Sequence, residues 1–333
     1  MTGDTMTILR SHNGRLAKLV RDDGTVEGYD RARLFDIATE TIDGIGGLER
    51  VLGKLLRRPD CAVVRGAIAD PARTHGVRRF VHADPKTGDM PTLVEVPRWW
   101  LALDVDGLPP PSRIDPRDLP ACGNFAHAAL PPAFRSVRAI LTASASHAIK
   151  PGARLRLWFW CSRPCCGPEL RRWLRDAPVD HSVFRPAQLI YTAAPVFADG
   201  VQDHLPTRMA MLHGDESALP VPSKTALAPP PPRSVKLPAA GSAGGSRYAL
   251  AALIKATSRV AQAAVNSRHC TMVAEARGLS RLIGAGLLTV AEVKHALGQA
   301  AETAGKTADE AEAVLEWALA HPSSARPSDG AGR

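Results

Sequence analysis

Four consecutive prolines, Pro229–Pro232, interrupt the chain about two thirds of the way along its 333 residues. They cannot lie in a helix or a central strand, because proline has a fixed φ and no backbone N–H. The surrounding segment 219–246 is rich in proline, glycine and serine, which is typical of a linker. We therefore expect an N-terminal domain over 1–218 and a separate C-terminal module.

The sequence after this linker predicts a compact all-α module over residues 247–321. Apolar residues recur at helical spacing behind Ser246, a candidate N-cap, and a second helix is predicted over 272–283. Thr289 and Thr307 each precede a glutamate by three residues, the spacing of a capping box that opens a helix. The last twelve residues, after this module, are predicted to be disordered (322–333).

The N-terminal domain mixes the two kinds of periodicity, which predicts an α+β fold with a core over about 60–215. The predicted helices are 29–42, 46–58 and 168–177. The predicted strands are 61–68, 78–83, 98–107, 137–146, 153–162 and 187–197.

One predicted strand, RWWLALDVDG, is apolar except for two aspartates near its end. Side chains at positions i and i+2 of a strand point to the same face, so Asp104 and Asp106 stand side by side. Two carboxylates this close repel each other unless positive charge lies near them. Two interpretations stay open: a bound cation, or a strand end in water, where aspartate is common.

Two later positions could share this chemistry. His147 ends a predicted strand, with Lys150, Arg154 and Arg156 following, and Asp180 comes after an apolar residue at the start of a strand-like region. Mg²⁺ prefers carboxylate oxygens, and three carboxylates can hold two ions about 4 Å apart. A histidine among basic residues suits an incoming triphosphate, although a lone histidine is more often structural.

The order of these motifs resembles the archaeo-eukaryotic primase superfamily. The segments SHAIKPGARLRLWFWCSRP and VDHSVFRPAQLIYTAAP are similar to the primase-polymerase domains encoded by phages and integrated elements. The segment RYALAALIKATSRVAQAAVNSRHCTMVAEARGLSRLIGAGLL resembles the helical module that follows such domains, with NSRH where GSRN is common. The likeness extends from about Arg98 to Leu319.

The resemblance implies a mixed-sheet archaeo-eukaryotic primase-like catalytic core followed by a small all-α module. Asp104 and Asp106 match the family's first motif and Asp180 its third, which implies that these catalytic aspartates bind two Mg²⁺ or Mn²⁺ ions. His147, preceded by Ser146, matches the second motif and is implied to contact the phosphates of the nucleotide.

We assign Lys150, Arg154 and Arg156 to the phosphates of the same nucleotide from their charge alone. We therefore expect a DNA primase-polymerase, a nucleotidyltransferase that makes primers for a phage, plasmid or integrated element. Its expected partners are single-stranded DNA and nucleoside triphosphates. Phage relatives often continue into a helicase domain that the printed sequence lacks, so unwinding is expected from a separate helicase.

The composition agrees with a polyanionic partner, because lysine and arginine outnumber aspartate and glutamate by 42 to 33, a formal net charge of +9. The first fifteen residues lack the apolar segment of a signal peptide. No apolar run reaches the ~18 residues of a membrane helix, and the cysteine spacing is not that of a disulfide scaffold. We expect no membrane partner and a location in the cytoplasm of a bacterial host.

Three other interpretations stay open. A replication-initiation or DNA-binding protein could carry these motifs without polymerase activity. A haloacid-dehalogenase-like phosphatase would use Asp104 as nucleophile and Asp106 as acid/base, but the prolines after Leu108 and the lack of a downstream Asp-Asp pair argue against it. Cys161, Cys165 and Cys166 could hold zinc, although no second cysteine pair accompanies them.

Overall fold

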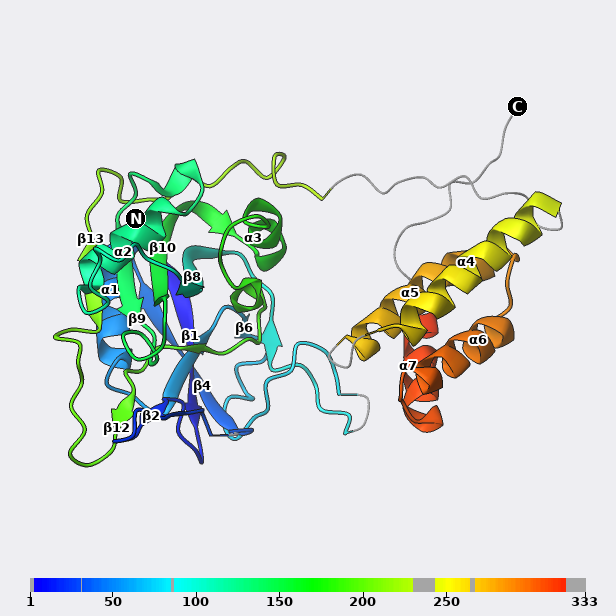
Figure 1. Cartoon of the computed structure of the whole chain (residues 1–333), viewed down its shortest axis with the longest axis horizontal. Helices are drawn as coiled ribbons and strands as arrows, with labels where there is room; N and C mark the ends of the chain where they lie inside the picture. Colours follow the sequence, from blue (N-terminus) through cyan, green and yellow to red (C-terminus); the bar gives the residue numbers. More distant parts are fainter. Residues whose placement is uncertain (1–2, 31, 85–86, 230–242, 264–266, 322–333) are drawn as a thin grey trace. The chain divides into compact units, whose positions relative to one another are not determined.

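The structure is a computed structural model that describes residues 3–30, 32–84, 87–229, 243–263 and 267–321. The chain forms two compact units, Met1–Pro229 and Pro230–Arg333 (Figure 1). The first unit combines β-sheets with helices and the second is helical. The predicted α+β class is therefore confirmed.

The first sheet of the N-terminal unit has the strand order β11-β5-β1-β4, and all neighbours are antiparallel. Its strands are β1 (Asp4–Ser11), β4 (Phe35–Ile42), β5 (Cys61–Val64) and β11 (Ile190–Tyr191). Strand β5 is buried along its whole length, as a short apolar run between glycine- and proline-containing turns allows. The segment 187–197, predicted as one continuous strand, contributes only the two residues of β11 to this sheet.

The second sheet carries the D-x-D motif and has the order β13-β9-β10-β8, again antiparallel throughout. Its strands are β8 (Arg98–Leu108), β9 (Ala139–Ala143), β10 (Ala153–Cys165) and β13 (Met209–Leu212). The long strands β8 and β10 confirm the predicted strands 98–107 and 153–162. Apolar residues of both strands form the main core, among them Leu103, Val105, Leu155 and Leu157.

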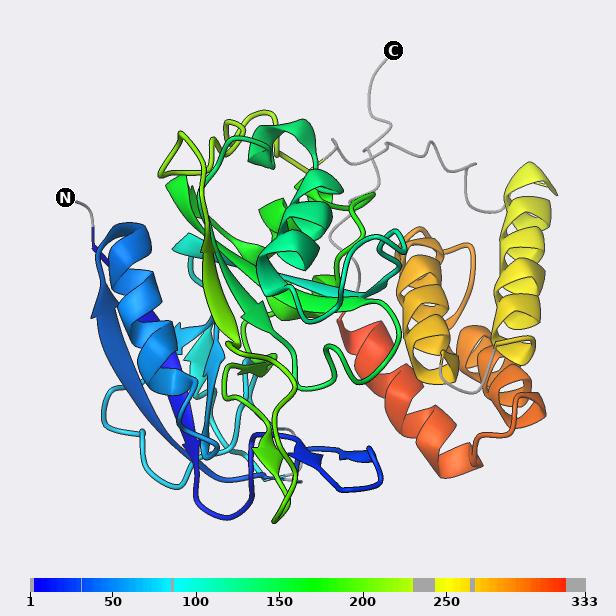
Figure 2. The same cartoon turned by 60° about the vertical axis from the view of Figure 1, so that its left-hand side comes forward.

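Helix α1 (Gly44–Leu55) contacts β4 of the first sheet and β9 and β10 of the second, so it packs between the two sheets (Figure 2). Helix α2 (Leu119–Ala128) covers β9, β10 and β13, and α3 (Gly167–Trp173) follows β10 directly. Two small sheets complete the unit, with the orders β12-β2-β3 and β6-β7. Their strands are Leu19–Val20 (β2), Val26–Glu27 (β3), Ala67–Ile68 (β6), Leu93–Val94 (β7) and Val196–Phe197 (β12).

Two predicted elements of the N-terminal half are wrong. The segment 29–42 is not a helix, because its second half is strand β4, which pairs with β1 along its full length. Phe35 and Ile37 are buried at strand spacing, and the neighbouring β-branched residues favour an extended backbone. The segment 78–83 forms no strand; the Phe80 N–H donates instead to the hydroxyl of Thr92.

The C-terminal unit contains the helices expected from the sequence, within its described residues. They are α4 (Ala243–Ala261), α5 (Arg268–Gly284), α6 (Val290–Thr303) and α7 (Ala308–Ala320). The Thr289 hydroxyl accepts from the Glu292 N–H and the Glu292 carboxylate accepts from the Thr289 N–H, which confirms that capping box. Thr307 caps α7 through its hydroxyl alone. Ser246 is not an N-cap, because it lies inside α4.

The predicted linker 219–246 differs from the structure at both ends. Leu219 and Leu227 are buried in the core of the first unit. The Leu219 N–H donates to the Trp160 carbonyl at 2.7 Å, so this end of the segment belongs to the first unit. Helix α4 already begins at Ala243. The residues between, 230–242, and the predicted tail, 322–333, lie outside the described residues.

A close backbone contact fixes the end of the β8–β10 pair. Gly107 and Gly152 have φ of 80° and 83°, a left-handed conformation that glycine adopts at low cost. A Cβ added to Gly152 would lie 2.7 Å from the carbonyl carbon and oxygen of Gly107. The two glycines therefore allow the strands to meet directly after the segment that carries Asp104 and Asp106.

We expect Gly152→Ala to destabilise the first unit more than Gly88→Ala. Both substitutions strain a left-handed backbone. A Cβ added to Gly88 would meet no atom within 4 Å, whereas a Cβ added to Gly152 would clash with Gly107. The clash should cost Gly152→Ala about 1–3 kcal/mol more free energy of unfolding, the usual penalty of overpacking. Urea unfolding followed by tryptophan fluorescence measures both. Equal losses would show that the Gly107–Gly152 contact is not a structural requirement.

Candidate functional site

Asp104 and Asp106 lie on one face of β8, with the buried Val105 between them on the other face. The register of the β8–β10 pair places Arg156 opposite Asp104 and Arg154 opposite Asp106. Arg156 Nη2 donates to Asp104 Oδ2 at 2.8 Å, and Arg154 Nη1 donates to Asp106 Oδ1. Two cross-strand ion pairs therefore supply the positive charge that is needed to offset the repulsion between these carboxylates.

The two pairs differ in their exposure to water. The side chains of Asp104 and Arg156 are 23% and 12% exposed, whereas the Asp106 side chain is 68% exposed. Arg156 also donates to the carbonyl of Tyr191. Asp104 is therefore held in a partly enclosed ion pair, while the Asp106 carboxylate remains largely open to solvent.

Asp180 lies next to Asp104 through its main chain, because the Asp180 N–H donates to the Asp104 carbonyl at 2.9 Å. Asp180 is the N-cap of a short 3₁₀ helix, His181–Phe184, rather than the start of a strand. Its carboxylate accepts from the N–H and the hydroxyl of Ser182. The structure thus brings all three predicted aspartates into one neighbourhood, and the Asp180 side chain caps its own helix.

His147 lies in the turn between β9 and β10 and is fully buried. Its Nδ1 accepts a hydrogen bond from the Arg154 N–H at 3.2 Å, and Nε2 makes no hydrogen bond of normal geometry within the described residues. Burial lowers the pKa of His147, which favours the neutral ring that this bond requires. His147 therefore holds the backbone of the arginine that pairs with Asp106.

The turn around His147 is strained. Ala148 has a φ of 61°, a left-handed value that costs a non-glycine residue about 1–2 kcal/mol. Ser146 is buried and its hydroxyl lies 3.5 Å from that of Ser144, while Lys150 is exposed. Such strain persists only where the surrounding structure holds it, and it is concentrated at functional sites.

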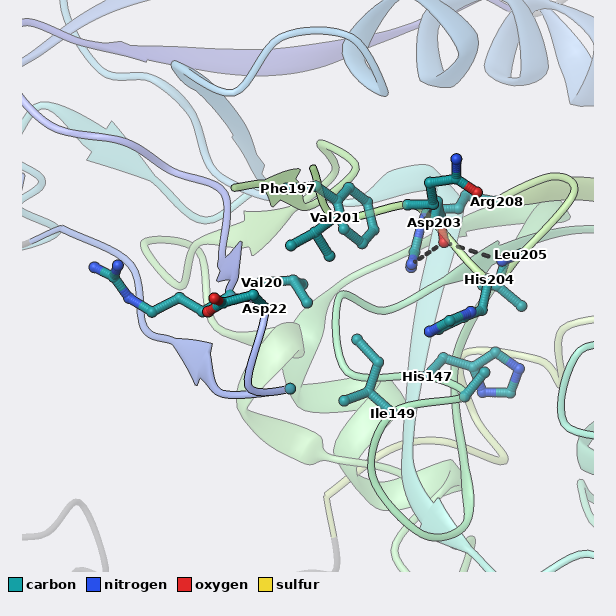
Figure 3. A pocket seen from close by; sticks show the side chains of 14 residues that line it. Val20, Asp22, His147, Ile149, Phe197, Val201, Asp203, His204, Leu205 and Arg208 are labelled. Atoms are coloured by element: carbon teal, nitrogen blue, oxygen red, sulfur yellow. Dashed lines mark hydrogen bonds and ion pairs between the residues drawn. The ribbon is translucent and has the colours of Figure 1, made fainter. Parts of the chain in front are cut away.

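A pocket of about 270 Å³ opens beside His147 (Figure 3). Three segments of the chain line it: the turn after β2, the turn at 147–149, and the segment from Phe197 to Arg208. Arg208 forms an ion pair with Asp203 and donates to the Ser144 carbonyl, so these two charged residues of the lining pair with each other, whereas Arg21 pairs with Glu27 outside the lining. The volume of the pocket is close to ~300 Å³, the lower end of the range for ligand pockets.

Sequence reasoning missed two residues near the aspartates, Lys18 and Tyr29. The Tyr29 ring stacks on that of Tyr191 with centroids 3.4 Å apart, and Lys18 Nζ lies 5.4 Å from the Tyr29 centroid. Both residues line a small cavity together with Arg156. No periodicity marks them, because they lie in short irregular segments around β2 and β3.

The chemistry of the donor set suits Mg²⁺ or Mn²⁺, because Asp104 and Asp106 offer carboxylate oxygens on one face. Each uses one oxygen in its arginine pair, so the other oxygen is outside that bond. Within the described ranges, no three His, Cys, Asp or Glu side chains are gathered closely enough to hold a metal ion. The predicted two-ion site is therefore a proposal that rests on residue type and neighbourhood.

The cysteine cluster is packed into the core. Cys161 and Cys165 are buried, and burial raises the pKa of each thiol to about 12. We therefore treat Cys161 and Cys165 as apolar core residues.

A comparison of the chain with models of known protein families, with curated proteins and with solved structures finds no match. The resemblance to archaeo-eukaryotic primases therefore stays a prediction, and function has to be inferred from the site. In the part of the chain that the structure describes, no helix has both the length and the apolar character to cross a membrane.

Neutralising either aspartate should show how much each ion pair contributes to the free energy of unfolding. Asp104→Asn leaves the mostly buried Arg156 without its carboxylate, so we expect a loss of about 1–3 kcal/mol in the free energy of unfolding. Asp106→Asn breaks an exposed pair and should cost less than about 1 kcal/mol. Urea unfolding compares them, and a larger loss for Asp106→Asn would contradict this order.

The buried histidines predict a pH dependence of stability. Burial lowers the pKa of both His127 and His147, so the unfolded chain binds protons at a higher pH than the folded chain does. The contribution of these two histidines to the free energy of unfolding should therefore be constant above pH ~6.5 and fall as the pH drops below it. His147→Gln should flatten this fall in urea unfolding between pH 7 and 5; an unchanged slope would show that His147 does not contribute.

Proposed function

We propose that the first unit is the catalytic unit of a DNA primase-polymerase that extends strands on a single-stranded DNA template. One observation carries this proposal: Asp104 and Asp106 share a face of β8, each opposite an arginine of β10, with Asp180 bound to the Asp104 carbonyl. Carboxylates can bind cations and arginines can bind phosphates, so this arrangement suits a reaction of a phosphate substrate that carries bound cations. The basic balance of the chain supports a polyanionic substrate.

In the proposed reaction, a 3′-hydroxyl oxygen forms a bond to the α-phosphorus of a nucleoside triphosphate. The bond from that phosphorus to the bridging oxygen breaks, pyrophosphate leaves, and the hydroxyl proton passes to solvent. Asp104 and Asp106, with Asp180 beside them, would hold Mg²⁺ or Mn²⁺. Such ions neutralise phosphate charge and activate the attacking hydroxyl.

The protein's own residues position the substrate in this proposal. Arg154 and Arg156 supply positive charge at the phosphates, and the pocket beside His147 accommodates the nucleoside part. His147 acts as a positioning residue, because it is buried and bonds to the Arg154 main chain. The family resemblance implies that His147 contacts the phosphates directly. We propose this indirect role instead.

The test is strand synthesis on single-stranded DNA with Mg²⁺ or Mn²⁺, with and without a primer and with NTPs and dNTPs in separate reactions. We expect Asp106→Asn to lower the extension rate by about 100-fold or more, the usual loss when transition-state charge is no longer stabilised. Asp176→Asn, an exposed aspartate of the same unit, is the matched control. Extension by Asp106→Asn at the wild-type rate would overturn the assignment.

The same reactions separate the alternatives. DNA binding in a mobility-shift assay, without synthesis under any of these conditions, would favour a replication-initiation or DNA-binding protein. Hydrolysis of a phosphate monoester without DNA binding would favour the phosphatase interpretation.

A further inference from the structure

Two helices of the C-terminal unit carry opposite charge. Helix α4 contains three basic residues, Arg247, Lys255 and Arg259, and no acidic residue. Helix α7 contains four acidic residues and neither lysine nor arginine. We propose that the exposed face of α4 binds the exposed face of α7 in a second copy of this chain, so that the chain associates through two different surfaces. This inference holds whether or not the chain synthesises DNA.

The two helices are held apart within one copy of the unit. Both α4 and α7 pack on α5 and on α6. Figure 2 shows α4 and α7 on either side of α5. The α7 that covers the exposed face of α4 therefore has to come from another chain.

Each of the two faces carries large apolar side chains among its charges. Leu250 and Ile254 lie one turn apart on α4 and are 57% and 56% exposed. Trp317 of α7 is 45% exposed, and the exposed Ala313 lies one turn before it on the same face. Apolar residues at this spacing are typical of a helix face that packs on another element. Their burial against a second copy would stabilise the association.

Most of the charges on these faces are not balanced within the unit. Arg259 pairs with Glu275 of α5. Lys255 of α4 and Glu312 and Glu316 of α7 form no ion pair with any residue that the structure describes. Complementary charges orient two partners, and like charges exclude a wrong one. A second α4 would place basic residues opposite basic residues, whereas α7 offers carboxylates.

A groove of about 570 Å³ extends the exposed face of α4 toward α5. Its lining combines basic residues such as Lys255 and Arg281 with small residues such as Ala251 and Gly278. A Cβ added to Gly278 would meet no atom within 4 Å, so this part of the groove is open. The groove can therefore accept a large side chain of the partner helix, such as Trp317.

Nucleic acid is the other partner that a basic helix attracts. Its phosphates need only cations, and its bases stack on aromatic rings. Leu250 and Ile254 are exposed and aliphatic, so they contribute to neither contact. An acidic helix with its own exposed apolar residue matches both the charges and the apolar residues of α4, which favours α7 of a second copy.

An interface between two different faces has a consequence for the assembly. Each pair of chains keeps one free α4 face and one free α7 face, so association continues along a chain of copies or closes into a ring. One helix–helix contact is smaller than the ~1,600 Å² of a standard interface, so the association should be weak. It should therefore increase with protein concentration and decrease with salt.

The test measures the weight-average mass of the full chain by analytical ultracentrifugation at increasing protein concentration, in low and in high salt. Two double variants reverse the charge on one face each: Lys255→Glu with Arg259→Glu on α4, and Glu312→Lys with Glu316→Lys on α7. We expect each to raise the apparent dissociation constant about 10-fold or more, because like charges then meet. The chain with all four substitutions should associate again, since its two faces have exchanged their charges.

The apolar contact and the specificity have their own variants. Ile254→Ala and Trp317→Ala change no charge and should each weaken the association several-fold. Glu216→Lys with Lys224→Glu exchanges two exposed charges of the first unit and should leave the mass unchanged.

Circular dichroism verifies that each variant is folded. Because Arg259 pairs with Glu275, the α4 double variant is the one most at risk. Lys255→Glu alone replaces it if it is not folded.

Three results would overturn the inference. The first is a chain that stays monomeric at every concentration in low salt, and loss of single-stranded DNA binding in its α4 double variant would then assign this face to nucleic acid. The second is association that the α7 double variant leaves unchanged, since α4 would then have another partner. The third is a chain with all four substitutions that is folded and does not associate.

Discussion

The antiparallel pairing of β8 with β10 is the interaction on which the rest of the site depends. On one face of the pair, Leu103 and Leu157 are buried in the main core, and on the other Asp104 faces Arg156. A shift of the register by one residue would move every side chain to the opposite face, burying the charges and exposing the core. The hydrophobic core therefore fixes the position of each carboxylate relative to its arginine.

The same pairing reaches the turn that leads into β10. Arg154 joins three features at once: its main chain binds His147, its side chain binds Asp106, and its carbonyl accepts from the Ser144 N–H. The strained Ala148 and the close contact of Gly107 with Gly152 lie in this same region. Because the turn is held from several sides, it can keep the unfavourable backbone at Ala148, which an isolated loop would relax.

Much of this unit could be predicted from sequence, and the failures have a common physical cause. The alternation in 98–107 predicts both the strand and the shared face of Asp104 and Asp106, since side-chain direction in a strand is a local property. The ion pairs with Arg154 and Arg156 depend on register, which a single strand does not reveal. In 29–42, β-sheet pairing with β1 prevails over a helical pattern, because tertiary contacts outweigh weak local preferences.

Lys18 and Tyr29 are the clearest case of a site that sequence patterns do not predict. They precede Asp104 by 86 and 75 residues (104 − 18 and 104 − 29) and occupy irregular segments with no periodic signal. Their place beside Arg156 arises because β2 pairs with β12 and Tyr29 stacks on Tyr191. By contrast, the capping box at Thr289 is predictable, since the threonine and the glutamate that form it are only three residues apart.

The ion pairs leave both partners with capacity to bind a ligand. Arg156 Nη2 carries two N–H groups, and the second oxygen of the Asp104 carboxylate is outside their hydrogen bond. In the proposed reaction, a phosphate and a cation can therefore bind beside the pair without breaking it. Without ligands, the Asp104–Arg156 pair compensates both charges and limits the cost of holding them partly buried.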